Sequence, residues 1–311
     1  TVIGLENKER VEILKGTSGL QAGTSAPGGL INYVVKRPTE DDLRRLRVEA
    51  TSEGGFLAHV DLGGRFGQER EFGYRFNLAG EHIGSHVPHA DGKRQLAALA
   101  MDWRIGRDSL LEVELEHSRR RQPSVPGLSL LGDRLPPADP FININSQPWS
   151  QPGVMRNLSG SVRFEQALAP GWSWSAQLAS QQLRADDRLA YPYGCYDAGS
   201  GIYYADRYCP DGGYDLYDFR SDDERRTTRA AQLALKGELK AAGLTHRLRL
   251  GVMAGRHTDL GSPQADNNAA VGTGNIFTLP ALPADPSYTD PYTNLRERST
   301  EFFVQDAIEW A

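Results

Sequence analysis

The sequence lacks any long hydrophobic run. No segment approaches the roughly 18 consecutive apolar residues of a membrane-crossing helix, so a transmembrane helix is excluded. The mean hydropathy is negative, but this does not favour a soluble protein. Strands of membrane β-barrels alternate apolar and polar residues, and their average hydropathy is therefore low.

Catalytic motifs and strong net charge are also missing. The net charge is −5 with both signs mixed, so the sequence lacks the excess of basic residues that is typical of nucleic-acid-binding proteins. We therefore predict no nucleic-acid partner. Neither a His-Glu-x-x-His nor a Gly-x-Ser-x-Gly motif occurs. The carboxylates are dispersed over alternating positions, as expected of a polar barrel lumen. We therefore predict that the chain is not an enzyme and that it holds no resident metal or cofactor.

From about residue 43 onward, the sequence shows repeated segments of period two. Leu111, Val113 and Leu115, for example, alternate with Glu112 and Glu114. Such a strand has one apolar and one charged face. The pattern predicts about ten strands, near 43–51, 56–65, 72–83, 93–105, 109–120, 156–168, 172–185, 224–240, 244–257 and 299–311.

The connections between these strands alternate in length. Short turns near 106–108, 169–171 and 241–243 alternate with long loops near 121–155, 186–223 and 258–298. Outer-membrane barrels have this asymmetry, with tight periplasmic turns and long extracellular loops. Trp103, Trp172 and Trp174 lie beside short turns, where an interfacial aromatic girdle is expected. Core tryptophans of a soluble sheet are the alternative.

A glycine-rich stretch precedes the strands. Residues 11–14 are mostly apolar, five glycines and Pro27 supply turn positions over 16–29, and residues 30–35 read as a buried strand that stops at Pro38. A ligand-free turn is one interpretation. A phosphate-binding loop is disfavoured, because no Gly-Lys-Ser/Thr ending or helix pattern follows.

This order of strand, glycine-rich apical turn, strand and Lys-Arg-Pro exit over 9–39 resembles the last part of the plug domain of TonB-dependent outer-membrane receptors. The resemblance implies an all-β fold, in which 1–40 is the C-terminal part of a plug and 41–311 is the N-terminal part of a transmembrane β-barrel. In the family that barrel has about 22 antiparallel strands. Residues 1–10 have no signal-peptide pattern, and we expect an internal fragment of a longer protein.

The same resemblance implies a function. It predicts a receptor in the bacterial cell outer membrane that binds a ferric siderophore and imports it by active transport. The partner would be a TonB-type energy-coupling protein, which engages an N-terminal segment missing here. Outer-membrane lipid and lipopolysaccharide would surround the barrel, and the chelate would be transported ligand rather than cofactor.

Cys195 and Cys209 are the only cysteines and lie in one long loop. An even count in an outward loop of an exported protein predicts a disulfide. Closing about 15 residues would restrict the loop by roughly 3 kcal/mol on the chain-entropy model. Zinc binding is disfavoured, because no nearby His or Cys completes four ligands.

Candidate ligand contacts precede the first cysteine. Tyr191 and Tyr193, followed by Gly194 and Cys195, resemble the region of ferrichrome receptors in which two tyrosines touch the siderophore before a disulfide-bonded loop. Their spacing of two places both side chains on one face of a strand. An apolar ring with a hydroxyl tip suits an iron chelate. Tyrosines that only brace the loop are the alternative.

The apical turn differs from ferrichrome receptors, which have a tyrosine before the turn glycine where this chain has Ala22 before Gly23. The loop after the fifth strand also lacks the aromatic contacts expected there, which argues against ferrichrome itself. By position at the apex, Gln21, Thr24 and Ser25 would offer hydrogen bonds to a more polar chelate, with Ala22 and Gly23 between them.

Three further groups of residues are candidates for ligand binding or ion pairing. His82, His86 and His89 suggest a metal or haem site, although solvated loop histidines are commoner. The basic step Arg119, Arg120 and Arg121 would contact lipopolysaccharide phosphates or simply be solvated. Lys36 and Arg37 are expected to pair with wall carboxylates such as Glu112 or Glu114.

Three other functions remain open at this point. They are a receptor for cobalamin, haem or an oligosaccharide, a passive porin, and a soluble β-sheet binding protein. A folded plug argues against the porin, because a filled pore conducts poorly. Ligand competition would distinguish the receptor for another nutrient. Partitioning into detergent would distinguish the soluble binding protein.

Overall fold

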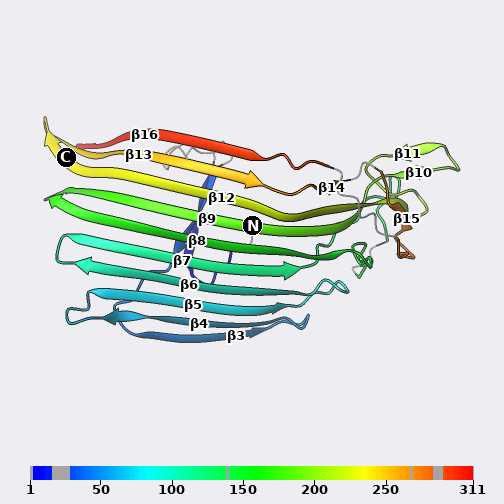
Figure 1. Ribbon diagram of the computed structural model, residues 1–311, viewed down its shortest axis with the longest axis horizontal. Coiled ribbons are helices and arrows are strands. Elements are labelled where there is room, and N and C mark those ends of the chain that lie inside the picture. Colours follow the sequence, from blue (N-terminus) through cyan, green and yellow to red (C-terminus); the bar gives the residue numbers. More distant parts are fainter. Residues whose placement is uncertain are drawn as a thin grey trace.

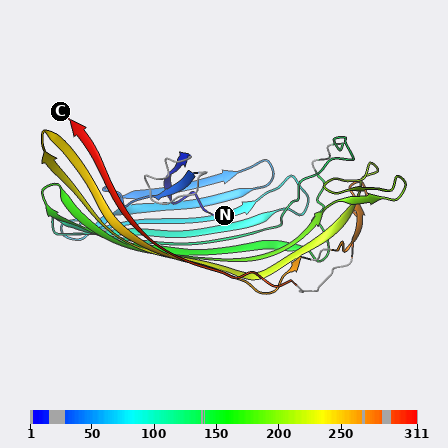
Figure 2. The same cartoon turned by 90° about the horizontal axis from the view of Figure 1, so that it is seen from above.

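The computed structural model describes residues 3–15, 29–137, 139, 141–266, 269–282 and 290–310. Within them the chain forms one large antiparallel sheet with the strand order β16-β13-β12-β9-β8-β7-β6-β5-β4-β3, and β14 and β15 pair with β12. A second sheet of two strands, β1 and β2, lies on the concave side of the first (Figures 1 and 2). No helix long and apolar enough to cross a membrane occurs in this described part.

The ten predicted strands are confirmed. They are β3 (Leu43–Ala50), β4 (Phe56–Phe66), β5 (Phe72–Ile83), β6 (Gly92–Ile105), β7 (Ser109–Gln122), β8 (Gln151–Ala169), β9 (Trp172–Pro192), β12 (Gly213–Ala241), β13 (Leu244–Leu260) and β16 (Leu295–Trp310). The other elements are β1 (Lys8–Lys15), β2 (Gly29–Val35), β10 (Cys195–Asp197), β11 (Ile202–Tyr204), β14 (Ala265–Asp266) and β15 (Gly272–Asn275).

Two of the predicted strands, β9 and β12, are too short at the long-loop end, because the prediction ends β9 too early and begins β12 too late. β9 and β12 extend past the predicted bounds by several residues at the long-loop end, where they continue to pair with each other as far as Leu216 and Pro192. The polar sequence of these extensions has the composition of a loop. Their pairing comes from the partner strand, which no local pattern reveals.

The two faces of the large sheet follow the period-two pattern. Val113, Val162, Leu178 and Ala231 form one lateral row across four strands, and the three larger side chains are exposed on the convex face. The residues that alternate with this row along each strand, such as Glu114 on β7 and its lateral neighbours on the adjacent strands, face β1 and β2. The outward apolar and inward polar arrangement is that of a barrel wall in lipid.

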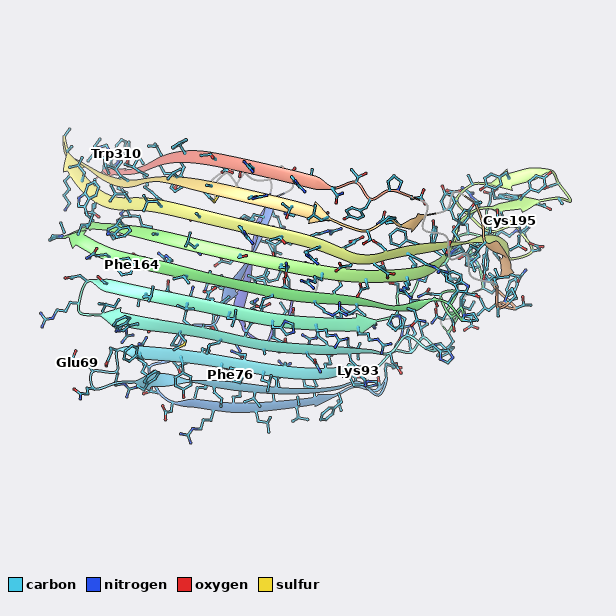
Figure 3. The ribbon with its side chains drawn as sticks, viewed as in Figure 1. Glu69, Phe76, Lys93, Phe164, Cys195 and Trp310 are labelled. Carbon is cyan, nitrogen blue, oxygen red and sulfur yellow. A yellow bond between two sulfur atoms is a disulfide. The ribbon has the colours of Figure 1, made fainter. Side chains whose placement is uncertain are left out.

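The two ends of the sheet differ in chemistry. At the short-turn end, Gly106, Gly171 and Gly243 adopt positive φ, which lets connections of two or three residues reverse the chain. Aromatic rings gather at this end on the convex face. Phe72 stacks on Phe66 and Trp103, and Phe164 contacts Trp174. Figure 3 shows Phe164 and Trp310 toward this end, and Cys195 at the opposite end.

Candidate functional site

The segment that follows β2 is fixed to the wall by a buried ion triad. Asp61 on β4 is fully buried. It accepts hydrogen bonds from Lys36 Nζ at 2.9 Å and from Arg75 Nε and Nη2 at 2.6 and 2.8 Å. A buried carboxylate is stable only when charged partners satisfy it. The prediction that Lys36 pairs with a wall carboxylate is therefore confirmed, and the partner is Asp61 on β4 rather than the suggested Glu112 or Glu114 on β7.

The prediction for Arg37 is confirmed. Its guanidinium lies 2.7 Å from Glu114 and 3.4 Å from Glu112, and Glu112 also contacts Arg163 on β8 at 3.2 Å. The alternation of β7 directs both glutamates to the concave face, and this made them plausible partners from the sequence alone.

The start of the described chain is attached in the same way. Glu6 accepts two hydrogen bonds from Arg94, at 2.7 and 2.9 Å, and Arg94 also donates to Glu81 at 2.7 Å. Lys8 pairs with Glu116. Together with the contacts of Lys36 and Arg37, these ion pairs hold the small sheet mainly against strands β4 to β7.

A polar cavity of about 530 Å³ lies between the small sheet and the wall. Asn32 and Tyr33 of β2 line one side, and Ser161, Gln177 and Gln181 of β8 and β9 are among the residues that line the other. The wall also contributes charged side chains, among them Arg75, Glu114 and Glu116, so hydrogen-bonding and charged groups make up most of the lining. Such a lining suits a hydrophilic solute.

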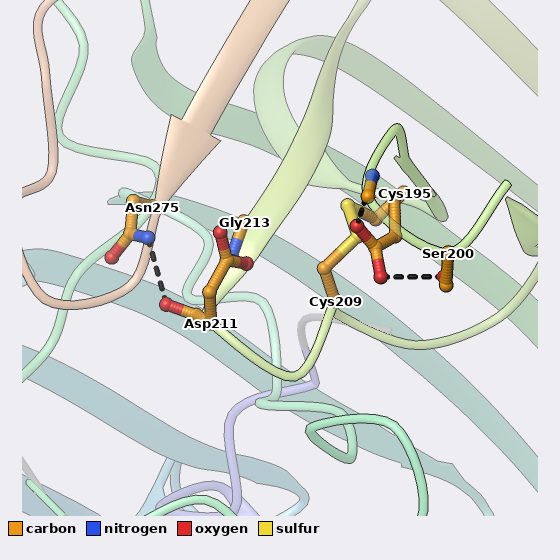
Figure 4. The surroundings of a disulfide bond; sticks show 8 residues. Cys195, Ser200, Cys209, Asp211, Gly213 and Asn275 are labelled. Atoms are coloured by element: carbon orange, nitrogen blue, oxygen red, sulfur yellow. Dashed lines mark hydrogen bonds between the residues drawn. A yellow bond between two sulfur atoms is a disulfide. The ribbon is translucent and has the colours of Figure 1, made fainter. Parts of the chain in front are cut away.

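The predicted disulfide is confirmed. Cys195 and Cys209 are bonded, with their Cα atoms 5.5 Å apart, and they close the β10–β11 hairpin (Figure 4). Hydrogen bonds brace the same region. Asp211 accepts from the Gly213 amide at 2.9 Å, and its carbonyl accepts from Asn275 at 3.0 Å. The hairpin is thereby joined to β12 and β15.

Tyr191 and Tyr193 meet a third tyrosine that sequence reasoning did not select. The ring of Tyr217 on β12 stacks on Tyr191 at 5.8 Å between centroids, and it contacts Tyr193 edge-on at 6.2 Å. Tyr193 is 54% exposed. Burial, the first of several causes, raises the pKa of Tyr217. The three phenol groups form one cluster at the top of β9 and β12, which we call the tyrosine cluster.

A β-bulge explains why Tyr217 was missed. The pairing of β12 with β9 shifts by one residue between Ser221 and Glu224, and Asp223 there has a φ of 55°. An extra residue exchanges the two faces of a strand. Tyr217 therefore lies opposite Tyr191 on the concave face. If β12 were a regular strand without the bulge, the alternation of its membrane part would place Tyr217 on the convex face.

The tyrosine cluster belongs to the polar side of the wall. Where the pairing of β9 with β8 or β12 shifts register, the extra residue lies on β8 or on β12. The side chains of β9 therefore alternate between the two faces of the sheet without a break. Tyr191 accordingly shares a strand face with Gln177 and Gln181, which line the cavity beside β2.

The three long loops pack into one unit. Ile144, Tyr208, Tyr214, Leu216 and Ile276 form a buried apolar cluster contributed by all three loops. Trp149 Nε1 donates to the Leu282 carbonyl at 3.0 Å. Of the many tyrosines in 186–223, Tyr208 and Tyr214 are core residues of this unit, whereas Tyr196 and Tyr203 are exposed.

The remaining candidates divide into described and undescribed residues. Gln21, Ala22, Gly23, Thr24 and Ser25 all lie outside the described residues, so their predicted ligand contacts stay predictions.

The histidine and arginine candidates can be placed. Within the described part of the chain, no group of three or more His, Cys, Asp or Glu side chains could hold a metal ion, and this includes His82, His86 and His89. In the basic step, Arg119 pairs across strands with Arg156, and Arg120 donates to Gln122. Alternation turns Arg119 and Arg121 to the convex face and Arg120 to the concave one.

Comparison with known proteins gives relatives of one kind. The chain is 30% identical over 253 residues to the metal-pseudopaline receptor CntO of Pseudomonas aeruginosa, an alignment that covers 78% of this chain and 32% of the relative. It is 22% identical over 333 residues to the ferrichrome outer membrane transporter/phage receptor of Escherichia coli, covering 97% of this chain and 42% of the relative. No protein-family model matches. The chain thus spans about a third to two fifths of these curated relatives.

Solved structures give the same fold. The ferric preacinetobactin receptor BauA of Acinetobacter baumannii matches with a TM-score of 0.82 and 20% identity, covering 99% of this chain and 45% of that one. The ferripyoverdine receptor of Pseudomonas aeruginosa matches with a TM-score of 0.79 and 18% identity, covering 97% and 39%. The large sheet therefore has the fold of the outer-membrane receptor barrels, and the relatives are named as receptors and a transporter.

Proposed function

We propose that this chain, a homologue of the TonB-dependent siderophore receptors of the bacterial outer membrane, is part of a receptor that binds a ferric siderophore and imports it by TonB-coupled active transport. In this proposal, 1–40 is the C-terminal part of a plug and 41–311 is the N-terminal part of the barrel. The protein is not an enzyme, and the siderophore is its cargo rather than a cofactor.

The observation that carries the proposal is the tyrosine cluster. Tyr191, Tyr193 and Tyr217 lie at the long-loop end of the wall, beside a disulfide-closed hairpin, on the strand face that leads down to the polar cavity. Rigid aromatic rings with hydroxyl tips bind a partly apolar chelate at low entropic cost.

The apex residues complete the proposed site. Gln21, Thr24 and Ser25, with Ala22 and Gly23 between them, would meet the chelate from the plug side and favour one with many polar groups. The relative with 30% identity is named as a receptor for metal–pseudopaline, so that complex belongs among the ligands to be tested.

The further partners of the proposal follow from the same assignment. A TonB-type protein would pull on a segment N-terminal to this chain. Outer-membrane lipid and lipopolysaccharide would face the convex wall, where Arg119 and Arg121 point outward. No nucleic acid is involved. A receptor for cobalamin, haem or an oligosaccharide remains the alternative, and a passive porin is a more distant one.

The test uses the full-length protein, with quenching of intrinsic tryptophan fluorescence as the readout. The ligands are hydroxamate, catecholate and mixed ferric siderophores and metal–pseudopaline, with cobalamin and haem as controls. We expect saturable submicromolar binding of one chelate class. Binding of a control ligand alone would reassign the receptor to another nutrient.

Variants then test the site. Tyr191→Ala and Gln21→Ala should each weaken that binding, the tyrosine by about tenfold, or ~1.4 kcal/mol. Tyr74→Ala is the matched control, because Tyr74 lies on the convex face against Phe66 and should leave affinity unchanged. Unchanged affinity in both test variants would remove the site assignment while keeping the receptor.

A further inference from the structure

The segment that carries the tyrosine cluster is strongly acidic. Residues 186–223 contain nine aspartates and three arginines, and they contain no glutamate or lysine. Their net charge of −6 is larger in magnitude than the −5 of the whole chain. Charge of one sign around a binding site raises the local concentration of ligands of the opposite sign. The segment therefore favours a positively charged ligand.

Most of these aspartates have partners inside the protein. Five form ion pairs with arginines and two accept hydrogen bonds that brace the loop; the first group is Asp186, Asp206, Asp218, Asp222 and Asp223, and the second is Asp197 and Asp211. The other two, Asp187 and Asp215, have no cationic side chain within ion-pair distance among the residues that the structure describes. Burial raises the pKa of both carboxyl groups, and Glu224 adds to the shift at Asp187.

Asp215 lies directly beside the tyrosine cluster. Its backbone amide donates to the Gly194 carbonyl at 2.9 Å, and its own carbonyl accepts from the Tyr193 amide at 2.9 Å. Alternation along β12 turns the Asp215 side chain to the same face as Tyr217. After burial, the nearby Tyr203 and the Asp215 carboxylate are further causes that raise the pKa of Tyr217. The carboxylate and the phenol rings are therefore neighbours on the concave face.

Tyr203 of the disulfide-closed hairpin also reaches this place. Its hydroxyl lies so close to Gly194 that a Cβ atom added there would be 2.6 Å from it. Gly194 also has a φ of 72°, so both the backbone and the available space require glycine at this position. Tyr193 and Tyr203 are 54% and 51% exposed. Both rings thus remain accessible to a ligand beside Asp215.

Electron-rich rings next to a carboxylate without a cation suit an organic cation. A protonated amine or a guanidinium group is attracted to the faces of tyrosine rings, and it forms strong charge-assisted hydrogen bonds with a carboxylate. A metal ion fits less well. In the part of the chain that the structure describes, no group of three or more His, Cys, Asp or Glu side chains could hold one.

We propose that Asp215 and the tyrosine cluster bind a protonated amine or guanidinium group of the transported chelate, so that Asp215 selects chelates with a positive charge. This inference rests on the proposed function and names the substrate class of the same site. Asp187 continues the preference inward, because it shares a face of β9 with Tyr191 and with Gln181 at the polar cavity. A chelate that moves down the wall then meets a second carboxylate without a cationic partner.

The test measures binding to the full-length protein by quenching of tryptophan fluorescence. The probes are a linear ferric trihydroxamate that ends in a primary amine and the same chelate with that amine acetylated, together with a corresponding pair of ferric catecholates. Wild type should bind the amine form of one pair about tenfold more tightly than the acetylated form. D215N should bind both forms with the affinity that wild type has for the acetylated one, which also verifies that the variant is folded.

The matched control is D133N. It removes one negative charge from another long loop, where the Asp133 side chain is 92% exposed and pairs with Arg207. This variant should keep the wild-type preference for the amine form. An equal loss in D133N and D215N would mean that the overall charge of the loops, and not Asp215, selects the ligand.

Other outcomes separate this proposal from the receptor assignment. Equal affinity of wild type for the two forms of a pair would overturn the cation site and keep the receptor. Displacement of the amine form by an equal concentration of a free alkylamine would indicate a site for free amines instead. Wild type that binds only a siderophore without an amine would overturn this proposal alone, whereas wild type that binds no siderophore would overturn the proposed function as well.

Discussion

Two tyrosines of the loop unit behave differently from the tyrosine cluster. Tyr208 and Tyr214 are each only 1% exposed, and their rings lie 5.7 Å apart. Burial raises the pKa of Tyr208, and it raises the pKa of Tyr214 to about 12. Since the charged phenolate is disfavoured in this apolar surrounding, both groups stay neutral in the packed loops.

These shifts predict a loss of loop stability at alkaline pH. Between the unfolded pKa near 10 and the folded value near 12, the unfolded loop has released its proton and the folded one has not. The stabilisation is thus complete below about pH 10 and is lost as the pH rises toward 12. Hydrogen exchange of the loop amides against pH measures it. Tyr214→Phe should flatten the profile, and an unchanged profile in that variant would contradict the assignment.

Asp61 provides a second prediction for a single residue. Asp61→Asn keeps the side-chain shape but leaves Lys36 and Arg75 with no charged partner in a buried site. Removing one partner of a buried ion pair costs about 3–5 kcal/mol. We expect faster hydrogen exchange in β1 and β2, because the segment that anchors them is loosened.

The control for Asp61 is a surface pair. Glu49→Gln breaks the contact with Arg47, in which both side chains are about half exposed, and such pairs contribute little. Exchange in β1 and β2 should match wild type. If Asp61→Asn gave the same rates as Glu49→Gln, the triad would not anchor the plug strands.

Sequence reasoning succeeded for residues whose partners follow from local periodicity. Tyr191 and Tyr193 share a face because their spacing is two, and Arg37 meets Glu114 because β7 turns alternate glutamates inward. Tyr217 was missed because the bulge that turns it is not visible in a pattern of period two. Asp61 was missed because the lateral position of the plug on the wall is a tertiary property.

At the scale of elements, strands were predictable and the structure inside the loops was not. Ten strands were found from alternation, since one face of each must be apolar in lipid. The hairpin of β10 and β11, only three residues per strand, has no such constraint. It depends on the disulfide and on packing of Tyr208 and Tyr214, which distant loop segments surround.

The disulfide should therefore stabilise this hairpin. Replacing both cysteines with alanine (Cys195→Ala, Cys209→Ala) releases a loop of about 15 residues, which costs roughly 3 kcal/mol on the chain-entropy model. Limited proteolysis within 196–208 should become faster, and siderophore affinity should fall because Tyr193 loses its fixed neighbour. Wild type treated with a reductant is the control. Proteolysis at the wild-type rate in both samples would mean that packing alone holds the hairpin.

At the scale of the whole molecule, the proposed function assigns capture to the wall and its loops, and it assigns the plug role to the small sheet of β1 and β2. The tyrosine cluster lies on the wall and its loops, whereas the plug strands are attached by ion pairs to β4 through β7 (Figure 2). In the proposed function, capture requires no movement of these contacts, whereas release requires several of them to break together. Loss of a partner costs several kcal/mol at the largely buried pairs of Asp61 and Glu6, and less at Arg37, which is about half exposed. Thermal motion alone opens such an arrangement rarely.

The physical consequence is that binding and uptake should separate when the energy supply is removed. In cells that carry the full-length receptor, an uncoupler of the proton gradient should leave siderophore binding at the surface unchanged, because the tyrosine cluster is passive. Accumulation of the radiolabelled iron inside should fall to the level of cells without the receptor. Uptake that continues at the same rate in uncoupled cells would contradict the clamped plug and favour a passive pore. Loss of binding together with uptake would instead show that capture itself depends on the energised state.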